Sequence, residues 1–302
     1  MKVERIIGSY TSGIEGPLLF VTAGIHGNEP SGVVALQQIF TELKQSKPQI
    51  RGTFVGVSGN QLGLTREVRY IDQDLNRTWT ETNLLSTSET PHEFKEMRAI
   101  IEVLQHYLEK QPEKGYFLDC HTTSSPSAPY ISVQDVNDNC SWARRFPTPV
   151  VIGFSDIITG DIDHYLSRIG LTGFVFEAGQ HTSEDAVVNH QAMIWLALHE
   201  ACGLDFDHLS KYPDAVTALL KKHQSKQKAF KILYRHELTK DDSFQMEPGF
   251  ENFSKVKKGQ LLAIENGTEI RSQWDANIFM PLYQPLGDDG FFIIDAVAAL
   301  DR

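Results

Sequence analysis

Two residues near the start of the chain have the types and spacing of metal ligands. His26 and Glu29 lie three positions apart in the stretch Val21-Thr-Ala-Gly-Ile-His-Gly-Asn-Glu-Pro-Ser-Gly-Val33. A neutral imidazole nitrogen and a carboxylate oxygen both suit Zn²⁺. Either residue alone could be an ordinary histidine or an acid in the first turn of a helix. Together they predict two ligands of one zinc ion.

A hydrolytic zinc site needs a third protein ligand and a carboxylate that takes the proton of the attacking water. His121, in Leu118-Asp-Cys-His-Thr-Thr123, is the best candidate for the third ligand. Glu177, in Phe174-Val-Phe-Glu-Ala-Gly179, suits the role of general base. Both residues follow apolar runs that read as strands. Each could be a strand-end residue without a function, but their shared position favours a common site.

The elements that must position these residues follow from the apolar pattern. Strands are predicted at Ile6–Tyr10, Leu18–Ala23, Thr53–Val57, Tyr116–Cys120, Val150–Phe154 and Gly173–Phe176. Helices are predicted from Pro30 to Leu43, from Phe94 to Lys110, and from a cap at Thr182 or Ser183 to Ala201. Alternating strands and helices indicate an α/β fold with a mixed, largely parallel sheet and helices on both faces. Ligands bind such sheets beyond the carboxyl ends of the strands.

The pattern changes after about residue 205. A helix is expected at Pro213–Lys222, and short β-like runs follow at Phe230–Leu238, Leu261–Glu265, Ile278–Leu282 and Phe291–Ile294, with glycines between them. We therefore predict a catalytic domain at residues 1–205 and a small β-rich C-terminal domain at residues 206–302 that shapes the entrance of the site. Residues 60–90 are expected to form a long irregular loop, a feature that is often functional.

Composition limits the class of protein. The net charge of −11 argues against a general nucleic-acid binder, although the arginines Arg66, Arg69 and Arg77 could still bind a small anion. The sequence contains no run of eighteen apolar residues, so we expect no membrane span. The three cysteines do not have the spacing of a disulfide framework, and the N-terminal residues lack the apolar core of a signal peptide. Both observations favour a reduced, cytoplasmic protein.

Four motifs in order give a specific resemblance. Gly24-Ile-His-Gly-Asn-Glu29, Asp74-Leu-Asn-Arg77, Asp119-Cys-His121 and Phe176-Glu-Ala-Gly179 resemble those of the succinylglutamate desuccinylase/aspartoacylase family. Pro248-Gly-Phe-Glu-Asn-Phe253 and Val256-Lys-Lys-Gly-Gln-Leu261 resemble the β domain of the same family. The resemblance implies a zinc amidohydrolase with a fold like that of the zinc carboxypeptidases and one zinc ion per chain.

The resemblance also implies roles for individual residues. His26, Glu29 and His121 match the zinc ligands, and Glu177 matches the general base. Arg69 matches the arginine that polarises the scissile carbonyl. Asn76 and Arg77 match the pair that binds the carboxylate of the amino acid, for which the planar fork of arginine is well suited. The acids Asp72, Asp74 and Asp119 are expected either to orient a zinc-bound histidine or Arg77, or to make only local hydrogen bonds in their loops.

Part of the family's substrate site is hard to place. Members that act on acyl-aspartate use a further arginine about ten residues before the base, where this chain has Ser167 and then Arg168. Arg168 is therefore a candidate for substrate binding. The family's substrate-binding tyrosine falls near Phe291-Phe292, and Tyr283 is not aligned with it. His164, Tyr165 and His181 flank the site in sequence and are either tuning residues or surface residues.

The leading interpretation is a zinc-dependent hydrolase that cleaves the amide bond of a small anionic N-acyl amino acid, as aspartoacylase or succinylglutamate desuccinylase does. One alternative is a zinc carboxypeptidase that acts on peptides. A second is a catalytically silent binding protein on the same scaffold. The sequence gives neither the acyl group nor the amino acid, and it leaves the oligomeric state open, a homo-oligomer included.

Overall fold

A computed structural model describes residues 3–110, 115–154, 157–223, 227–284 and 287–297. The strands of its α/β part are β1 (Ile6–Thr11), β2 (Ile14–Ala23), β3 (Arg51–Ser58), β4 (Tyr116–Thr123), β5 (Tyr130–Val133), β6 (Val150–Ile152) and β7 (Thr172–Gln180). The strands that follow are β8 (Ala229–Glu237), β9 (Phe244–Met246), β10 (Lys255–Val256), β11 (Leu261–Glu265), β12 (Thr268–Arg271), β13 (Ala276–Phe279) and β14 (Asp289–Val297).

One sheet runs through most of the described chain. Its eleven strands have the order β1-β3-β2-β4-β7-β5-β6-β8-β14-β13-β10. The central strands β3, β2, β4 and β7 are parallel, while β5 runs antiparallel to β7. The predicted mixed α/β fold is confirmed, and the parallel centre brings the carboxyl ends of β2, β4 and β7 to one edge.

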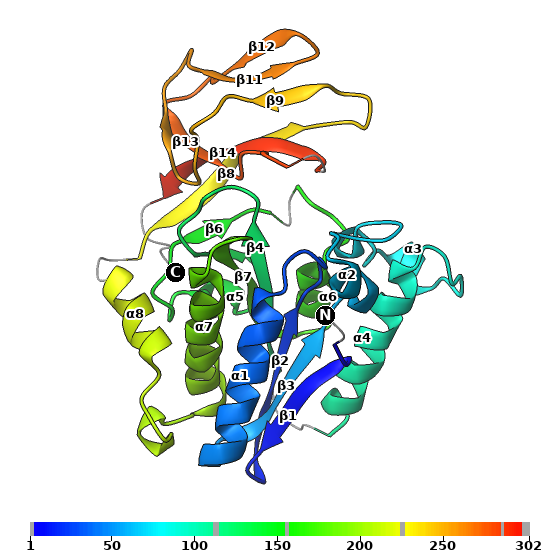
Figure 1. Cartoon of the computed structure of the whole chain (residues 1–302), viewed down its shortest axis with the longest axis vertical. Coiled ribbons are helices and arrows are strands. Elements are labelled where there is room, and N and C mark those ends of the chain that lie inside the picture. The colour runs from blue at the N-terminus through cyan, green and yellow to red at the C-terminus, as the bar shows by residue number, and fades with distance from the viewer. Residues whose placement is uncertain (1–2, 111–114, 155–156, 224–226, 285–286, 298–302) are drawn as a thin grey trace.

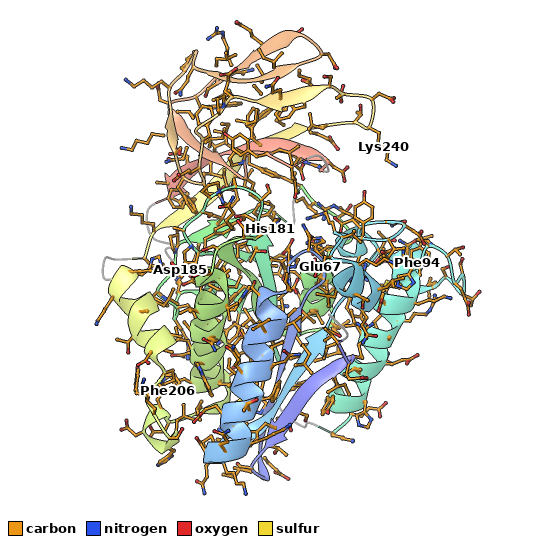
Figure 2. All side chains as sticks on the ribbon, viewed as in Figure 1. Glu67, Phe94, His181, Asp185, Phe206 and Lys240 are labelled. Carbon is orange, nitrogen blue, oxygen red and sulfur yellow. The ribbon has the colours of Figure 1, made fainter. Side chains whose placement is uncertain are left out.

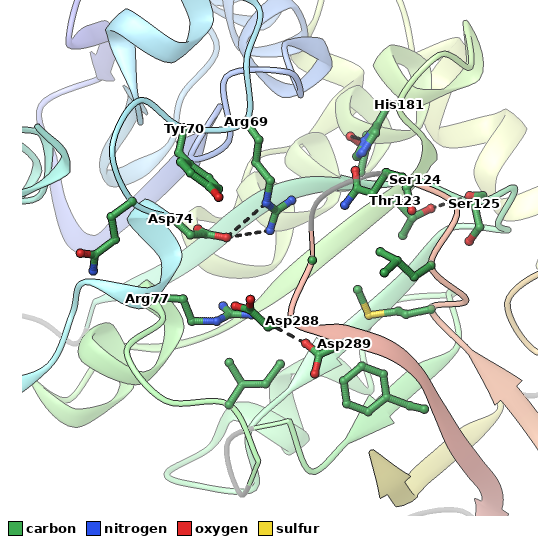
Figure 3. Close-up of a pocket in the computed structure, with 18 of the residues that line it drawn as sticks. Arg69, Tyr70, Asp74, Arg77, Thr123, Ser124, Ser125, His181, Asp288 and Asp289 are labelled. Atoms are coloured by element: carbon green, nitrogen blue, oxygen red, sulfur yellow. Dashed lines mark hydrogen bonds and ion pairs between the residues drawn. The ribbon is translucent and has the colours of Figure 1, made fainter. Parts of the chain in front are cut away.

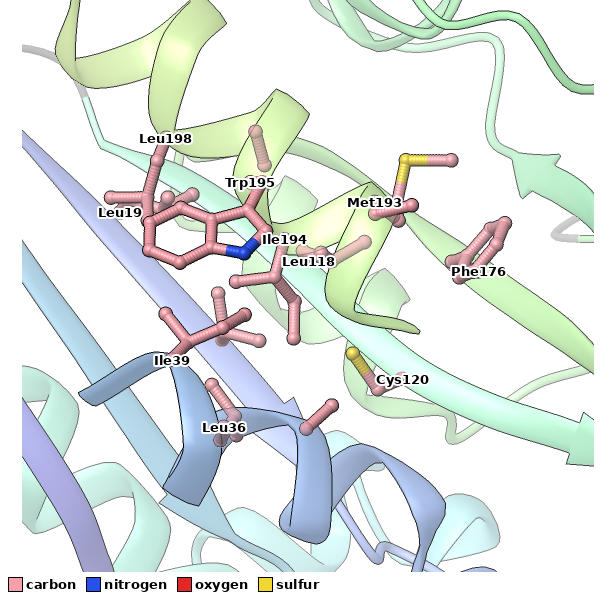
Figure 4. Packing of buried hydrophobic residues seen from close by; sticks show 14 of the residues in the cluster. Leu19, Leu36, Ile39, Leu118, Cys120, Phe176, Met193, Ile194, Trp195 and Leu198 are labelled. Carbon is pink, nitrogen blue, oxygen red and sulfur yellow. The ribbon is translucent and has the colours of Figure 1, made fainter. Parts of the chain in front are cut away.

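Helices cover both faces of the α/β part of this sheet (Figure 1). Helices α1 (Ser31–Ser46), α5 (Asn139–Ala143), α7 (Asp185–Cys202) and α8 (Asp214–Lys222) contribute to the core on one face. Leu36 and Ile39 of α1 pack there near Ile194 and Trp195 of α7, above Leu118 of the sheet (Figure 4). Burying this apolar stripe is what holds α1 and α7 on the sheet.

The opposite face is covered by α4 (Glu93–Leu108) and α6 (Ile162–Arg168). Met97, Ile100 and Leu104 of α4 share a core with Phe20 and Phe117 of the sheet. Among the described helices, none is both long enough and apolar enough to cross a membrane.

The β-rich end of the chain is continuous with the main sheet. Strand β8 pairs with β6, and β14, β13 and β10 follow in the same sheet. A second sheet has the order β12-β11-β9 and lies at the end of the molecule, as Figure 1 shows. The division into domains at residues 1–205 and 206–302 stays a prediction.

The segment between β3 and α4 differs from the expected irregular loop. It contains the short helices α2 (Gln61–Arg66), η1 (Leu75–Arg77) and α3 (Glu81–Leu84). The side chains of Asn60, Asp74 and Thr80 cap these helices by accepting bonds from backbone N–H groups. Asn, Asp and Thr are common cap residues, so these short helices could have been predicted from the sequence, and the expectation that the whole segment is irregular was wrong.

Candidate active site

Three buried side chains form a cluster suited to a metal ion. The ligand atoms of His26, Glu29 and His121 lie within 4.8 Å of one another. The three residues are 4%, 2% and 3% exposed. His26 and Glu29 follow β2, and His121 lies in β4, so the parallel pairing of these two strands brings the predicted ligands together.

Each histidine lies between Glu29 and a second acid. His26 Nδ1 is 2.8 Å from Glu29 Oε1, and its Nε2 is 3.0 Å from Asp74 Oδ1. His121 Nδ1 is 3.3 Å from Glu29 Oε2, and its Nε2 is 2.8 Å from Asp119 Oδ2. A carboxylate on the outer nitrogen fixes the orientation and tautomer of a ligating imidazole. This arrangement gives Asp74 and Asp119 the orienting position that the sequence suggested.

The charges of the cluster shift its pKa values in opposite directions. Burial would raise the pKa of Glu29, but His26 and His121 outweigh it and hold that pKa well below its usual range. Burial would lower the pKa of His121, but Asp119 and Glu29 raise it well above its usual range. The two acids therefore favour positive charge on His121, and a metal cation at the same place would have to displace a proton.

The loop that carries His26 and Glu29 depends on close backbone packing. A Cβ atom on Gly27 would lie 2.0 Å from the backbone carbon of Gly63 in α2, so only glycine fits. The backbone N–H of Gly27 donates to the carbonyl oxygen of Arg69 at 3.1 Å. This bond ties the ligand loop directly to the segment that carries the predicted carbonyl-polarising arginine.

Arg69 is fixed beside the cluster. Its Nε and Nη2 atoms donate to Asp74 Oδ2 at 3.2 Å and 2.9 Å, and its Nη1 is 3.7 Å from Glu29 Oε1. Burial would lower its pKa, but Asp74 and Glu29 outweigh it and raise the pKa further. Arg69 is thus a permanent positive charge at the edge of the candidate metal site.

Asn76 and Arg77 lie next to each other on η1. The side-chain oxygen of Asn76 accepts a bond from the backbone N–H of Ile162 at 3.0 Å, which joins η1 to the start of α6. Arg77 Nη1 donates to the backbone oxygen of Asn76 at 2.8 Å. Its Nη2 lies 4.0 Å from Asp289 Oδ2, at the start of β14. The guanidinium is partly exposed and retains donors for a ligand.

Glu177 faces the cluster from β7. It is the register partner of His121 across the parallel pair of β4 and β7, and it is 8% exposed. Its Oε2 atom has no hydrogen-bond partner among the residues that the structure describes. Burial raises its pKa to about 8, with Glu29 and Asp119 adding to the rise and with His121 and Arg69 opposing it. A pKa near neutrality suits a group that takes and returns a proton.

Two adjoining cavities surround these groups. We call the first the outer cavity; it has a volume of about 380 Å³ and is lined by Arg69, Asp74, Arg77, Thr123, His181 and Asp289, among others (Figure 3). The second, the inner cavity, has a volume of about 110 Å³ and is lined by His26, His121 and Glu177, among others. Arg69, Arg77, Ile158 and Met280 line both.

The β-rich end of the chain closes one side of the outer cavity. Lys240, Leu282, Asp289 and Phe292 line it from that end. In Figure 2, His181 lies below Lys240, near the level where the α/β part meets the β-rich part. His181 bonds through Nδ1 to Thr122 Oγ1 at 2.7 Å and lines the same cavity. Residues of the β-rich end therefore form part of the wall of the outer cavity.

The structure does not bring Arg168 to the site. Its side chain is 47% exposed, its Nη1 pairs with Glu81 Oε1 at 2.9 Å, and it lines neither cavity. Arg168 lies one position after the family's arginine position, which Ser167 occupies here, and its side chain is on the outer side of α6. Phe292 lines the outer cavity, while Phe291 packs against His236, and the hydroxyl of Tyr283 donates to the carbonyl oxygen of Glu247.

Sequence reasoning missed several residues that line the cavities, among them Tyr130, Asp161, Asp163 and Asp289. Tyr130 lies on β5, a strand of only four residues that was not predicted. Asp161 does carry a readable signal, because an Asp before an apolar helical turn is a typical N-cap. Nothing in the local pattern indicates that Asp163 and Asp289 face the same site.

The fold and the site define an α/β protein with a buried His–Glu–His cluster and a carboxylate beside it. Residues 15–196, more than half of the chain, match the family described as the succinylglutamate desuccinylase/aspartoacylase catalytic domain. The chain belongs to this family.

Individual relatives differ in how much they cover. An N-acyl-aromatic-L-amino acid amidohydrolase (carboxylate-forming) of Xenopus laevis is 34% identical over 107 residues, and the chain spans only 34% of its length. A probable aspartoacylase of Prochlorococcus marinus is 26% identical over 278 residues, with 87% of this chain and 81% of the relative covered. A solved succinylglutamate desuccinylase/aspartoacylase from Rhodobacter sphaeroides has a TM-score of 0.67 at 14% identity and covers 94% of this chain and 87% of its own, which shows the shared fold.

Proposed function

We propose that the protein is a zinc-dependent amidohydrolase that cleaves an N-acyl amino acid into a carboxylate and a free amino acid. The observation that carries the proposal is the His26–Glu29–His121 cluster with Glu177 in register beside it. The relatives act, by their names, on N-acyl aromatic amino acids, succinylglutamate or acyl-aspartate. Those substrates share an amide bond next to a free carboxylate.

The donor set of the cluster fits one zinc ion per chain. Two imidazoles and one carboxylate are a ligand set found in hydrolytic zinc sites, with a further position left for water. Asp74 and Asp119 already hold the outer nitrogens of His26 and His121, as the acids beside zinc-bound histidines do. A zinc ion bound here supplies Lewis-acid activation of water and of the scissile carbonyl.

The arginines and Asn76 position the substrate. The free carboxylate of the amino acid would pair with the guanidinium of Arg77, which lines both cavities, and with the side-chain amide of Asn76, which lines the inner one. The scissile carbonyl oxygen would then lie toward Arg69, whose charge stabilises the negative charge that develops on that oxygen. Asp74 and the backbone bond from Gly27 hold Arg69 in place before substrate arrives.

Glu177 moves the proton. It would accept a proton from the water that attacks the acyl carbon and return it to the amide nitrogen as the carbon–nitrogen bond breaks. Its unpartnered Oε2 and its burial leave it free for this exchange. The leaving amine becomes the free amino acid, and the acyl carbon keeps the oxygen of water as a carboxylate.

We also propose a cytoplasmic location, because Cys120, Cys140 and Cys202 are free and buried and require no oxidising compartment. The peptide-cleaving alternative is less well supported, because residues of the β-rich end line the outer cavity and limit the room for a long chain.

The test is an activity panel on the zinc-loaded protein. Acetyl-aspartate, succinyl-glutamate, neutral acyl-amino acids and short peptides are offered at the same concentration, and zinc content is measured in parallel. We expect hydrolysis of at least one class of acyl-amino acid and about one zinc per chain. Cleavage of peptides alone would favour the carboxypeptidase. A folded protein with neither zinc nor turnover would favour the silent scaffold.

A further inference from the structure

The inner cavity has an acidic end. Asp161 and Asp163, at the start of α6, line it together with Glu177. Their exposed fractions are 9% and 5%. Two carboxyl groups next to the catalytic carboxylate, in a cavity of about 110 Å³, are an unfavourable concentration of buried negative charge unless something compensates for it.

The hydrogen bonds to the two aspartates come from neutral groups. Asp161 Oδ1 accepts from the backbone N–H of His164 at 2.6 Å, and Asp163 Oδ1 accepts from Ser167 Oγ at 3.5 Å, while the side chain of Gln134 also stabilises the Asp163 carboxylate. Across the described parts of the chain, no ion pair joins either carboxylate to a Lys or Arg. Burial raises the pKa of both, although Arg77 opposes the rise at Asp161. Each carboxylate has oxygen lone pairs left for a donor.

A fully buried hydroxyl lines the same cavity and also lacks a partner. Tyr130 is 0% exposed, and its Oη atom bonds to no residue in the described part of the structure. Tyr130 pairs in register with Glu177 across β5 and β7, which places it beside the reacting groups. A buried polar group without a bond is costly, so the hydroxyl indicates a ligand atom in this cavity.

Apolar side chains also line the cavity, those of Phe154, Ile158 and Val175. Asn76 and Arg77 line it too, where the proposed function places the carboxylate of the substrate, and Asn76 is joined to the start of α6 through the backbone N–H of Ile162. The cavity thus offers, in one small space, a site for a carboxylate, an apolar wall and an acidic end with a free hydroxyl.

We propose that the inner cavity selects N-acyl amino acids whose side chain is a short aliphatic chain ending in an ammonium group. This inference rests on the proposed function. The α-carboxylate pairs with Arg77, the methylene groups lie along Phe154 and Val175, and the ammonium donates to Asp161, Asp163 and the hydroxyl of Tyr130. A side-chain carboxylate would instead lie beside like charges. Of the negative charges expected in an anionic substrate, this inference therefore keeps only the α-carboxylate.

The first test compares three substrates with the zinc-loaded wild-type protein. They are Nα-acetyl-L-ornithine, Nα-acetyl-L-norleucine, which has the same number of side-chain heavy atoms without the charge, and Nα-acetyl-L-glutamate. We expect kcat/KM to be at least about 10-fold higher for the ornithine compound than for the norleucine compound, as the loss of a charged hydrogen bond predicts, and higher still relative to glutamate. Equal or better hydrolysis of either competitor overturns the inference and leaves the proposed function standing.

The second test changes the acidic end. Asp163→Asn removes one charge, and Asp161→Asn does so while keeping a good N-cap for α6. Each should lower the ornithine-to-norleucine ratio about 10-fold, through KM for the ornithine compound. Asp185→Asn is the matched control, since Asp185 is exposed and paired with Lys222. A ratio that is unchanged in both cavity variants overturns the inference.

A third measurement separates the inference from turnover. Free L-ornithine and L-norleucine are titrated into the zinc-loaded wild-type protein by calorimetry, which also decides the matter if the Asp163 variant does not fold. Tighter binding of ornithine by at least about 10-fold supports the inference, even where no acyl-amino acid is hydrolysed and the proposed function fails. Equal binding, or no binding of ornithine, overturns it.

Discussion

His121 and Glu177 lie side by side as register partners on the parallel strands β4 and β7. Side chains of register partners in neighbouring parallel strands point to the same face of a sheet, so the pairing alone places the candidate base beside a candidate metal ligand. Tyr130 extends the same row, because β5 pairs it with Glu177 from the other side. Three residues from three strands thus form one line across the site, and none of them depends on a loop for its position.

The first prediction concerns the role of Glu177. Glu177→Gln removes the group that accepts the proton but preserves size and most packing. We expect zinc content to stay near that of the wild type and kcat to fall by about 10²- to 10⁴-fold, the usual contribution of general acid–base catalysis. Activity and metal content are measured on the same preparations, with the exposed Glu109→Gln as the control. A near-native kcat in Glu177→Gln would show that another group is the base.

The second prediction concerns the acids behind the histidines. Asp119 accepts a hydrogen bond from His121 Nε2 at 2.8 Å and another from Thr22 Oγ1 at 2.6 Å. Asp119→Asn should weaken zinc affinity by about 10- to 100-fold, because His121 loses the carboxylate that makes it a better ligand. His26→Ala should weaken it more, since a ligand itself is removed. Competition with a chelator gives both affinities, and an Asp119→Asn affinity equal to that of the wild type would contradict the proposed orienting role.

How far the sequence could predict this site depends on the residue. His26, Glu29, His121 and Glu177 follow or end apolar runs, and the rule that ligands gather at strand carboxyl ends was enough to expect them together. The structure places His121 and Glu177 inside longer strands than predicted, because β4 and β7 continue past the apolar core and are held by their pairing. The mixed α/β fold was likewise readable from the alternation of strands and helices.

Other parts of the site are set by tertiary pairing that no local pattern encodes. Tyr130 reaches the site because the short strand β5 adds antiparallel to β7, and four residues are too few to give a periodic signal. Asp289 reaches Arg77 because β14 pairs with β8 at the far end of the same sheet. Arg168 was a candidate only through an approximate alignment, and one position on a helix turns a side chain by about 100°, enough to leave the site.

The third prediction concerns pH. The pKa of His121 is raised in the folded protein, because Asp119 and Glu29 outweigh the effect of burial. In the metal-free protein its contribution to the free energy of unfolding is therefore complete below the unfolded pKa of about 6.5. That contribution is lost as pH rises through the folded pKa. Glu29 has a lowered pKa, so its contribution is present above its unfolded pKa and is lost as pH falls through the folded value.

Zinc reverses the direction of this dependence, because it requires a neutral imidazole. We expect the increase in Tm on adding zinc to be larger at pH 8 than at pH 6, and zinc uptake to release protons. Thermal unfolding of the metal-free and zinc-loaded protein across this range measures the difference. His208→Gln, at an exposed position, serves as the control. A zinc-induced shift that is the same at every pH would mean that His121 does not exchange a proton for the metal.

The last prediction concerns carboxylate recognition by Arg77. Arg77→Lys keeps the positive charge but loses the planar fork that can bond both oxygens of a carboxylate. KM should rise by about 10- to 100-fold, which corresponds to the loss of one hydrogen bond to a charged group, while kcat changes much less. Arg168→Lys is the matched control, because Arg168 is exposed, pairs with Glu81 and lines neither cavity. If Arg168→Lys raised KM as much as Arg77→Lys does, Arg168 would bind substrate after all. If Arg77→Lys lowered kcat with KM unchanged, Arg77 would act on the transition state rather than on the bound carboxylate.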